Sequence, residues 1–513
     1  MNTSATRQNA IWRLLADPAT HGGQTVARID THAASVFLTG SFAYKVKRDV
    51  KFPFLDFSTL AKRKAALEAE IVANKPFAPQ LYLGLVPITS DNGKLTLDGK
   101  GDPVEWALRM RRFDETQTLD HLAEAGRIER ELATALALAV AQAHERAPVV
   151  DAAPWISALR DYIDQNETDF AQHADIFPQI DAAPLIEATR AALDRVRPLL
   201  VKRGADGFVR RGHGDLHLGN IAMIDGAPIP FDALEFDPVM ASGDILYDLA
   251  FLLMDLVERD LGPAANTVLN VYFAARRNDE DIDALAALPL FMSLRAAIRA
   301  KVTAAKLPQA AAEKHEAITA SARAYFKLAC RLIAPAPPRA VAVGGLSGTG
   351  KSVLARMLAP CLAPEPGALV LRSDVERKAM LGVVETDRLP EAAYTREVTA
   401  RVYAVLAQKA RRILAAGHSS IIDAVFARPQ ERTMVVEAMR GKPSEFRGLF
   451  LTADLATRIA RVGGRVGDAS DAGGAVARAQ EAYDLGDLDW TKVDASGTPE
   501  DTLANALAAL GKN

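Results

Sequence analysis

The sequence contains few cysteines and few aromatic residues, and its net charge is close to zero. Only Cys330 and Cys361 occur among 513 residues, which argues against a disulfide framework and against a cluster of thiolate metal ligands. The formal net charge is -3. A value so close to zero gives no general attraction to nucleic acid or to an anionic membrane. These features argue against a disulfide-rich protein, a thiolate metal protein and a protein that binds polyanions through its net charge. A globular protein whose function depends on a local site fits this composition.

Long uncharged apolar runs are also missing. The most apolar stretch, residues 245–260, is interrupted by Asp248 and Asp255, and it is too short to span a membrane. The N-terminal residues lack the apolar run and the cleavage site of a signal peptide. We therefore expect a cytoplasmic protein. With 49% hydrophobic residues, it has enough apolar sequence for the two to four domains that a length of roughly 100–200 residues per domain predicts.

Proline marks the main division of the chain. Pro335, Pro337 and Pro338 lie close together in residues 331–340, and they favour an extended connector because proline does not continue a helix. A short apolar run and a glycine-rich loop follow. We predict one domain over residues 1–332, a linker over 333–340 and a second domain over 341–513.

The two predicted domains differ in their order of strands and helices. In the first, two strands are expected within residues 35–48, a helix over 58–75 with Ser58 as its N-cap, and further strands at 81–89, 94–99 and 104–113. Helices are expected from about residue 115 onward. The second domain alternates strands with helices, which is typical of a parallel sheet. The prediction is an α+β domain followed by an α/β domain.

A phosphate-binding motif opens the second predicted domain. Residues 345–352, GLSGTGKS, match the pattern G-x-x-x-x-G-K-[ST], with an apolar strand before it and an amphipathic helix after it. Glycines let backbone N–H groups surround a phosphate, a lysine reaches the β- and γ-phosphates, and a hydroxyl binds Mg²⁺. The residues predicted to bind ATP here are Gly345, Gly348, Thr349, Gly350, Lys351 and Ser352, and Ser352 is also a predicted Mg²⁺ ligand.

Three downstream residue groups extend this prediction. Asp374 follows the next strand and precedes Arg377 by one helical turn, a position that suits a general base. Asp423 ends a second apolar strand and is predicted to order the Mg²⁺ shell. Arg461 and Arg465 are predicted to close on ATP and stabilise charge on the transferred group. A helix N-cap for Asp374 and a solvated helix face for the two arginines remain alternatives.

These segments, over about residues 340–513, resemble P-loop kinases that phosphorylate small molecules or nucleic-acid ends, such as polynucleotide 5′-hydroxyl kinase, zeta-toxin and gluconate kinases. The resemblance implies that Asp374 is the general base. The sequence has no strongly basic surface interleaved with aromatic residues, so a small-molecule acceptor is favoured over nucleic acid, which stays an alternative.

A second chemical cluster lies in the first predicted domain, within HGDLHLGN at residues 213–220. Asp215 and Asn220 have the five-residue spacing of a kinase catalytic Asp and its Mg²⁺-binding Asn. A predicted hairpin then leads to Asp232, in the place of a second metal ligand. Upstream, Lys45 lies in a strand and Glu70 in the next helix, an arrangement that holds a lysine on phosphates.

This set resembles the aminoglycoside phosphotransferase branch of the protein-kinase-like fold over roughly residues 30–260. The resemblance implies a catalytic Asp215, Mg²⁺ ligands Asn220 and Asp232, and a phosphate-binding Lys45 oriented by Glu70. The segment that contains Asp244 and Asp248 also resembles that branch, in which an Asp of this segment is structural and supports the catalytic loop. Lys47 remains an alternative to Lys45, because residues two apart on a strand face the same way. In the following helix, Glu68 remains an alternative to Glu70.

Taken as a whole, the chain resembles bifunctional aminoglycoside phosphotransferase/ATP-binding proteins. The resemblance implies a bilobal protein-kinase-like α+β domain followed by an α/β P-loop domain with a parallel sheet. It also implies two kinases that use ATP and Mg²⁺ and transfer the γ-phosphate to hydroxyl groups of small molecules. Two alternatives stay open: one module binds nucleotide only to regulate the other, or the C-terminal module is a polynucleotide 5′-hydroxyl kinase.

Overall fold

The structure is a computed structural model, and it describes residues 3–52, 55–384, 387–440, 445–463, 469–471 and 473–511. The chain forms two compact units, each built from two segments. One consists of Met1–Tyr162 with Arg197–Asp255, and the other of Ile163–Val196 with Leu256–Asn513. The domain division at 333–340 stays a prediction, although residues 334–338 do lie outside helices and strands, as the three prolines suggest.

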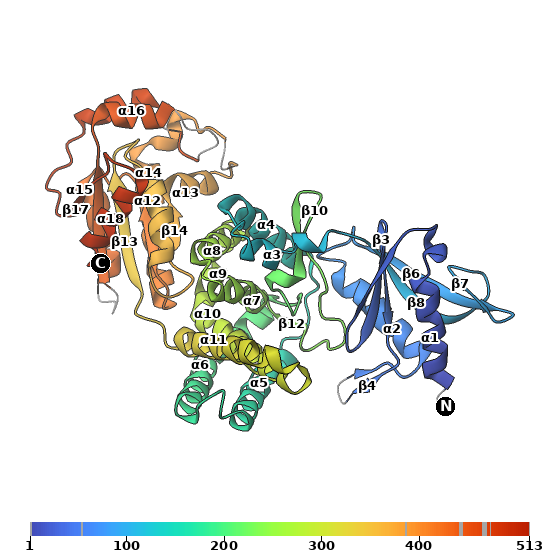
Figure 1. Cartoon of the computed structure of the whole chain (residues 1–513). Helices are drawn as coiled ribbons and strands as arrows, with labels where there is room; N and C mark the ends of the chain where they lie inside the picture. The colour runs from blue at the N-terminus through green and yellow to red at the C-terminus, as the bar shows by residue number, and fades with distance from the viewer. Residues whose placement is uncertain are drawn as a thin grey trace. The chain divides into compact units, whose positions relative to one another are not determined.

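A six-stranded antiparallel sheet dominates the N-terminal part of the first unit (Figure 1). Its strands stand in the order β1-β2-β3-β8-β6-β7. Their bounds are β1 Val26–Asp30, β2 Ala34–Thr39, β3 Phe42–Lys47, β6 Tyr82–Asp91, β7 Lys94–Leu97 and β8 Asp102–Arg111. The short strands β4 Lys51–Phe52 and β5 Leu55–Asp56 pair separately.

The side chains of β3 point alternately to the two faces of the sheet. Tyr44 and Val46 pack in a core with Ile11 and Leu15 of helix α1 (Thr3–Ala16). Since successive strand residues point to opposite faces, the lysines between and after them face the other side. That side carries helix α2 (Leu60–Asn74), which packs through Leu67.

The rest of the kinase-like part is mainly helical, as the sequence predicts. Its helices are α3 Leu119–Glu124, α4 Arg130–Arg146, α5 Ala153–Gln172, α6 Gln179–Ala205, α7 Ile245–Glu258, α8 Gly262–Arg276, α9 Glu280–Ala284, α10 Leu288–Ala304 and α11 His315–Ile333. Strand β9 (Val209–Arg211) pairs with β12 (Ser242–Asp244), and β10 (Ile221–Ile224) forms a hairpin with β11 (Ala227–Pro230). Asp225 and Gly226 make the hairpin turn with positive φ at both positions, which is the geometry that suits tight hairpins.

The C-terminal part contains a five-stranded sheet in the order β14-β15-β13-β16-β17. Every neighbouring pair is parallel, which confirms the prediction from the strand–helix alternation. The strands are β13 Arg339–Gly345, β14 Leu369–Arg372, β15 Ser420–Asp423, β16 Glu445–Thr452 and β17 Thr491–Asp494. The helices are α12 Lys351–Leu358, α13 Ser373–Met380, α14 Arg396–Ala415, α15 Pro429–Met439, α16 Leu455–Gly463, α17 Gly474–Ala479 and α18 Pro499–Ala509.

Both faces of this sheet are covered by helices (Figure 1). Ala340 and Ala342 of β13 pack in one core with residues of α14 and α15. Val341 and Val343 pack in another with residues of α12 and α18. The continuous apolar run of β13 follows from this burial, because a parallel strand covered on both faces needs apolar side chains on both.

Some local predictions were wrong. The N-cap of α2 is Thr59 rather than Ser58, because the Thr59 hydroxyl accepts the N–H of Lys62 while the Ser58 hydroxyl donates to Asp56. Helix α1 and strands β1, β9 and β12 were not predicted. No helix among the described residues combines the length and the apolar character needed to cross a bilayer.

Candidate functional site

A cavity of about 540 Å³ lies against the α2-facing side of the six-stranded sheet. One part of its lining is apolar, with Val36, Leu38 and Phe231 among the contributing side chains. Charged side chains also line it, among them Lys45, Lys47, Asp215, Asp232 and Glu235. A pocket that combines apolar and charged lining fits a ligand that joins a flat ring to phosphates.

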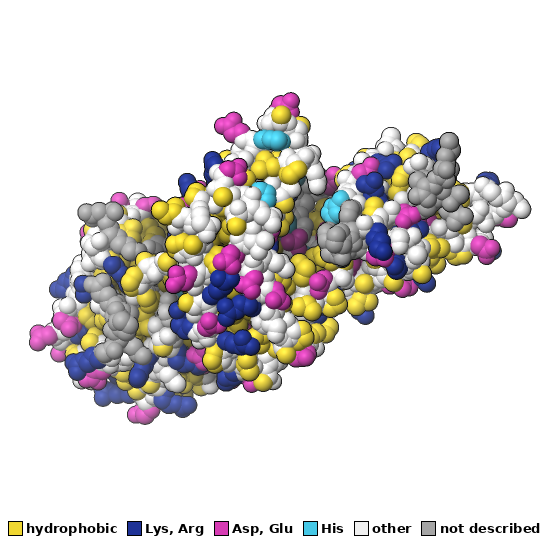
Figure 2. All heavy atoms as spheres, turned by 90° about the horizontal axis from the view of Figure 1, so that it is seen from below, with side chains coloured by type: hydrophobic (Ala, Val, Ile, Leu, Met, Phe, Trp, Pro, Cys, Tyr) yellow, Lys and Arg dark blue, Asp and Glu magenta, His cyan; other side chains and the backbone are white. Residues whose placement is uncertain are grey.

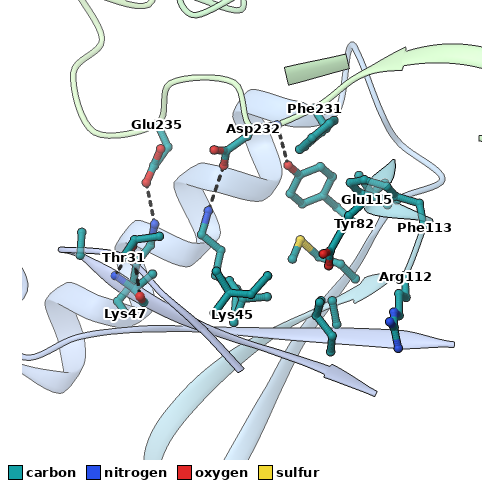
Figure 3. A pocket seen from close by; sticks show the side chains of 18 of the residues that line it. Thr31, Lys45, Lys47, Tyr82, Arg112, Phe113, Glu115, Phe231, Asp232 and Glu235 are labelled. Atoms are coloured by element: carbon teal, nitrogen blue, oxygen red, sulfur yellow. Dashed lines mark hydrogen bonds and ion pairs between the residues drawn. The ribbon is translucent and has the colours of Figure 1, made fainter. Parts of the chain in front are cut away.

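Five charged side chains form an alternating chain of ion pairs at this cavity. Lys45 Nζ lies 2.9 Å from Asp232 Oδ1 and 2.7 Å from Glu70 Oε1. Glu70 Oε2 lies 2.7 Å from Lys47 Nζ, which lies 2.6 Å from Glu235 Oε1. Figure 3 shows Lys45 and Lys47 pointing from β3 toward Asp232 and Glu235. The buried Glu70 carboxylate therefore positions both lysines. Each lysine in turn pairs with one acid of the segment after β11.

Electrostatics keeps this chain ionised. Burial opposes the charge on Glu70, yet Lys45 and Lys47 together hold its pKa below the ordinary value. Burial also opposes the charge on Lys45, and Asp232 and Glu70 outweigh it, so that the pKa of Lys45 is raised well above its usual range. Both side chains are charged at neutral pH, as phosphate binding requires.

The structure bears on both alternatives that the sequence leaves open. Lys45 and Lys47 do face the same way and both contact Glu70, but only Lys45 is paired with Asp232 among the described residues. Glu68 is exposed and pairs with Lys64, one helical turn away. Glu70 is fully buried at the lysines. The geometry thus brings Lys45, Glu70 and Asp232 together and leaves Glu68 at the surface.

The predicted catalytic loop brings Asp215 and Asn220 together. Asn220 Nδ2 donates to Asp215 Oδ2 at 2.9 Å and to the Asp215 carbonyl at 3.0 Å. His217 Nε2 lies 3.4 Å from the same Asp215 oxygen. Because the Asn220 amide nitrogen is used toward Asp215, its amide oxygen is the atom available for a metal.

Of the two acids in the segment that resembles the kinase branch, Asp248 supports this loop, whereas Asp244 pairs with Arg203. Its carboxylate accepts the N–H of His213 at 2.7 Å and of Gly214 at 2.9 Å, and it lies 3.1 Å from His144 Nε2. Gly214 has φ +78, and a Cβ there would come within 2.8 Å of the Leu234 side chain and 3.0 Å of the Ala241 Cα. A glycine is therefore needed where the loop passes the segment after Asp232.

A second cavity, of about 610 Å³, lies at the carboxyl ends of β13, β14 and β15. Lys351 and Ser352 line it at the start of α12, and Asp423 lines it at the end of β15, the strand between β13 and β14. Ser352 Oγ donates to Asp423 Oδ2 at 2.6 Å, and Lys351 Nζ donates to the Leu346 carbonyl at 3.2 Å. The sheet thus brings three of the predicted P-loop site residues to one edge.

Asp374 also lines this cavity. Burial raises the pKa of Asp374, the nearby Asp423 adds to the rise, and Lys351 and Arg372 act in the opposite direction. Arg377, expected beside Asp374, donates instead to the Ala393 carbonyl at 2.7 Å. The cations that act on Asp374 are therefore Lys351 and Arg372, and the role of Arg372 had no signal in the spacing of the sequence.

Arg458, which sequence reasoning missed, holds the phosphate-binding loop. It is buried, and its Nε donates to the Ser347 carbonyl at 2.9 Å. Gly348 has φ +88, and a Cβ there would lie 2.4 Å from the Arg458 carbonyl oxygen. The only sequence signal for Arg458 is its position one helical turn before Arg461.

Arg461, predicted to close on ATP, lies beside Gly350 of the loop, and its closure stays a prediction. Its NH1 would be 4.0 Å from a Cβ built at Gly350, and its guanidinium donates to the carbonyls of Ala495 at 2.7 Å and Gly497 at 2.9 Å. Arg465 lies outside the described residues.

The donor sets of both cavities fit Mg²⁺. Asp232 lines the first cavity and offers a carboxylate oxygen, and Asn220, which is bonded to Asp215 of the lining, offers an amide oxygen. In the second cavity, Ser352 and Asp423 offer a hydroxyl and a carboxylate oxygen. Mg²⁺ prefers such hard oxygen ligands and usually shares them with substrate phosphates. Among the described residues no group of three or more His, Cys, Asp or Glu side chains is placed to hold a metal, so a metal here depends on phosphate oxygens as well.

Comparison with known protein families assigns one family model to each of the two regions that carry the cavities. A model described as a phosphotransferase enzyme family matches residues 69–288, and one described as an AAA domain matches residues 341–483. The uncharacterized protein Rv2004c of Mycobacterium tuberculosis is 30% identical over 492 residues, which cover 93% of this chain and 94% of the relative. The chain belongs to this family, in which an aminoglycoside-phosphotransferase-like domain precedes a P-loop kinase domain.

Two solved structures are similar to parts of this family member. A choline/ethanolamine kinase family protein from Mesorhizobium loti is 14% identical with a TM-score of 0.37, covering 64% of this chain and 98% of that chain. A gluconokinase from Sinorhizobium meliloti is 19% identical with a TM-score of 0.26, covering 34% of this chain and 92% of that chain. The protein is an enzyme of the kinase and phosphotransferase class.

Proposed function

We propose that this family member carries two ATP- and Mg²⁺-dependent phosphotransferase sites, one in each cavity. Each site transfers the γ-phosphoryl group of ATP to a hydroxyl group of a small-molecule acceptor. The observation that carries the proposal is that each cavity collects a phosphate-binding lysine, hard oxygen donors for Mg²⁺ and a carboxylate for the acceptor hydroxyl. A domain kept only for nucleotide sensing has no need of the last of these groups.

In the first site, Asp215 accepts the proton of the acceptor hydroxyl. Lys45 donates to the phosphates, and Glu70 keeps its ammonium group in place at 2.7 Å. Asn220 and Asp232 hold Mg²⁺, whose charge neutralises the oxygens of the transferred group. The apolar part of the cavity receives the nucleotide base.

In the second site, the backbone N–H groups from Gly345 to Gly350 and the ammonium group of Lys351 bind the phosphates. Ser352 and Asp423, hydrogen-bonded at 2.6 Å, hold Mg²⁺. Asp374 accepts the proton of the acceptor hydroxyl; its raised pKa brings its basicity nearer to that of a useful general base. Arg461 stabilises charge on the transferred group.

The test uses the full-length chain and a panel of small hydroxyl compounds, with ADP formation as the readout. Asp215→Asn is expected to abolish turnover of one group of acceptors, and Lys351→Ala turnover of the other group. Asp206→Asn and Lys492→Ala, at exposed positions outside both cavities, serve as matched controls and keep both activities.

Each alternative has its own outcome in this test. If one of the two substitutions leaves turnover of every acceptor intact, its module is not catalytic and the regulatory alternative replaces the proposal for that module. If the chain phosphorylates 5′-hydroxyl oligonucleotides in a Lys351-dependent way, the C-terminal module is a polynucleotide kinase. Lys and Arg side chains lie interspersed with Asp and Glu side chains on the face shown in Figure 2, which favours the small acceptor.

A further inference from the structure

Five arginines line the P-loop cavity, and three of them lie outside β14 and α13. Arg388 precedes α14, Arg396 is its first residue, and Arg428 directly precedes α15. We call these three residues the arginine rim. All three are exposed, and they come from three separate segments of the chain, so that only the fold brings them to one cavity.

The arginine rim makes no ion pair with a carboxylate within the part of the chain that the structure describes. Five acids line the same cavity, Asp374, Glu391, Asp423, Glu431 and Asp471, and two of them have hydrogen-bond partners away from the rim. Asp423 accepts from Ser352, and Asp471 accepts from Tyr394 at 2.6 Å and from Lys378 at 3.2 Å. Glu431 accepts the backbone N–H of Arg428 at 3.1 Å, which does not involve the guanidinium group. Among the described residues no ion pair therefore joins a rim arginine to an acid, although the charge of Arg428 acts on the nearby Glu431 carboxylate.

Helix geometry adds to this positive charge. Arg396 begins α14, a helix of 20 residues, and Arg428 is the N-cap residue of α15, a helix of 11 residues. The N-terminus of a helix carries a partial positive charge that favours anions. Two helix N-termini and three guanidinium groups thus all add positive electrostatic potential to the cavity. Lys351, which also lines the cavity, adds to it as well.

The magnitude of the charge indicates the kind of anion. A guanidinium group binds the oxygens of carboxylates and phosphates through two parallel hydrogen bonds. Three such groups exceed the charge of one carboxylate, and they match a phosphate monoester, which has a charge near −2 and three acceptor oxygens. The cavity of about 610 Å³ has room for an acceptor of small-metabolite size beside the phosphates of ATP.

We propose that the acceptor of the P-loop site is a phosphorylated alcohol, whose existing phosphate monoester is held by Arg388, Arg396 and Arg428 while its free hydroxyl lies at Asp374. This inference rests on the proposed function of that site. In the reaction, the hydroxyl oxygen forms a bond to the γ-phosphorus, and the bond from that phosphorus to the β-bridging oxygen breaks. ADP leaves with the electron pair, and the hydroxyl proton passes to Asp374. The product carries two phosphate groups.

This assignment also states which kind of reaction supplies the acceptor. A phosphate monoester arises by phosphoryl transfer to a hydroxyl group, and that is the reaction proposed for the first site of the same chain. The two sites then act in sequence on one carbon skeleton, with the first phosphate serving as the binding group for the second transfer.

A binding experiment tests the anion site separately from catalysis. Inorganic phosphate is titrated calorimetrically into the full-length chain saturated with Mg²⁺ and a non-hydrolysable ATP analogue, so that the α-, β- and γ-phosphate positions of both nucleotide sites are occupied. We expect phosphate binding that weakens about tenfold in each of Arg388→Gln, Arg396→Gln and Arg428→Gln, because each substitution removes a charge-assisted contact, and that disappears in the triple variant. Arg411→Gln, an exposed arginine of α14 outside the cavity, is the matched control. No phosphate binding, or equal binding by the triple variant, overturns the site.

A turnover experiment in the Asp215→Asn background tests the acceptor class. Small polyols and their phosphate monoesters are compared as matched pairs. We expect Lys351-dependent turnover of monoesters only, with KM raised at least tenfold in the rim variants and unchanged in Arg411→Gln. Turnover of the neutral members at equal KM overturns the inference and leaves the kinase function intact. Rim-dependent phosphate binding without turnover of any pair overturns the kinase function and supports the anion site. Labelling of 5′-hydroxyl oligonucleotides that depends on the rim overturns the small acceptor.

Discussion

The two cavities hold their positive charges in different ways. In the first cavity Lys45 and Lys47 are bound to the carboxylates of Glu70, Asp232 and Glu235 at distances of 2.6 to 2.9 Å. Beside the P-loop, Arg461 donates to backbone carbonyls, and the arginine rim of the P-loop cavity makes no ion pair with an acid among the described residues. A carbonyl orients a guanidinium group but leaves its charge uncompensated.

The difference follows from where the charges lie. Lys47 is 3% exposed and Glu70 is fully buried, and buried charges persist only when they are paired. The rim arginines are exposed, so water solvates them until a ligand arrives. The first site therefore has its geometry set by ion pairs within the protein, and under the proposed function Lys45 exchanges Asp232 for phosphate when a nucleotide binds. The second site has its geometry set by the loop, and its rim arginines make no ion pair with an acid among the described residues.

The largest effect is expected from breaking the shared acid of the first site. Glu70→Gln leaves two buried lysines without their common partner, and breaking a buried ion pair costs about 3–5 kcal/mol. We expect first-site turnover to fall about 100-fold or more and the free energy of unfolding to drop. Kinetics in the Lys351→Ala background and urea unfolding measure the two effects.

Glu68→Gln is the matched control, since Glu68 lies on the same helix, is exposed and pairs only with Lys64 among the described residues. It should change neither turnover nor stability measurably, because exposed helical pairs contribute about 0.3–0.5 kcal/mol. Equal behaviour of the two variants would show that Glu70 does not organise the site.

The corresponding substitution in the second site should separate activity from stability. Asp423→Asn weakens the Mg²⁺ site that Asp423 forms with Ser352, and we expect P-loop turnover to fall about 100-fold. Unfolding should change little, because an amide of the same shape can still accept the Ser352 hydrogen bond. The measurements are kinetics in the Asp215→Asn background and urea unfolding. Asp489→Asn, at an exposed position outside the cavity, controls for loss of a charge; a large loss of stability in Asp423→Asn alone would contradict the contrast.

The sequence was sufficient where a short segment carries the chemistry. The parallel sheet, the β10–β11 hairpin and the juxtaposition of Lys351, Ser352 and Asp423 follow from strand periodicity and from residues that end neighbouring strands. The pairing of Asp215 with Asn220 follows from a spacing of five residues within one loop.

The sequence was insufficient where a contact joins distant segments. Period-2 alternation could not choose between Lys45 and Lys47, because both contact Glu70, and it gave no sign of Glu235, which lies 188 residues from Lys47 in the chain. Arg458 and the three rim arginines belong to no recognisable motif in the sequence. Their roles depend on where three-dimensional packing places them, and no local pattern encodes that.

A smaller effect is expected at the outer pair of the ion-pair chain. When Lys45 turns to a phosphate, Lys47 still holds Glu235 at 2.6 Å and so restrains the segment that carries Asp232. Glu235→Gln should raise the Mg²⁺ concentration for half-maximal first-site turnover about three- to tenfold, with a smaller change in kcat, since one charge-assisted hydrogen bond is weakened. Mg²⁺ titrations of turnover at fixed ATP measure this shift. A fall in kcat with no shift in the Mg²⁺ requirement would mean that Glu235 acts only on stability.

The smallest effect is a difference in salt dependence between the two sites. Exposed and uncompensated charges are screened by ions, and the Debye length falls from about 14 Å to about 4 Å between about 0.05 M and 0.5 M salt. We therefore expect kcat/KM for the acceptor of the P-loop site to fall about threefold over this range of NaCl concentration. The first-site kcat/KM should change less, because its lysines are buried in ion pairs and are screened little. Assays in the Asp215→Asn and Lys351→Ala backgrounds isolate the two sites, and removal of the three rim arginines should abolish the salt dependence of the second. Equal salt dependence of both sites would show that the paired lysines and the rim arginines contribute equally to the electrostatic attraction of a ligand.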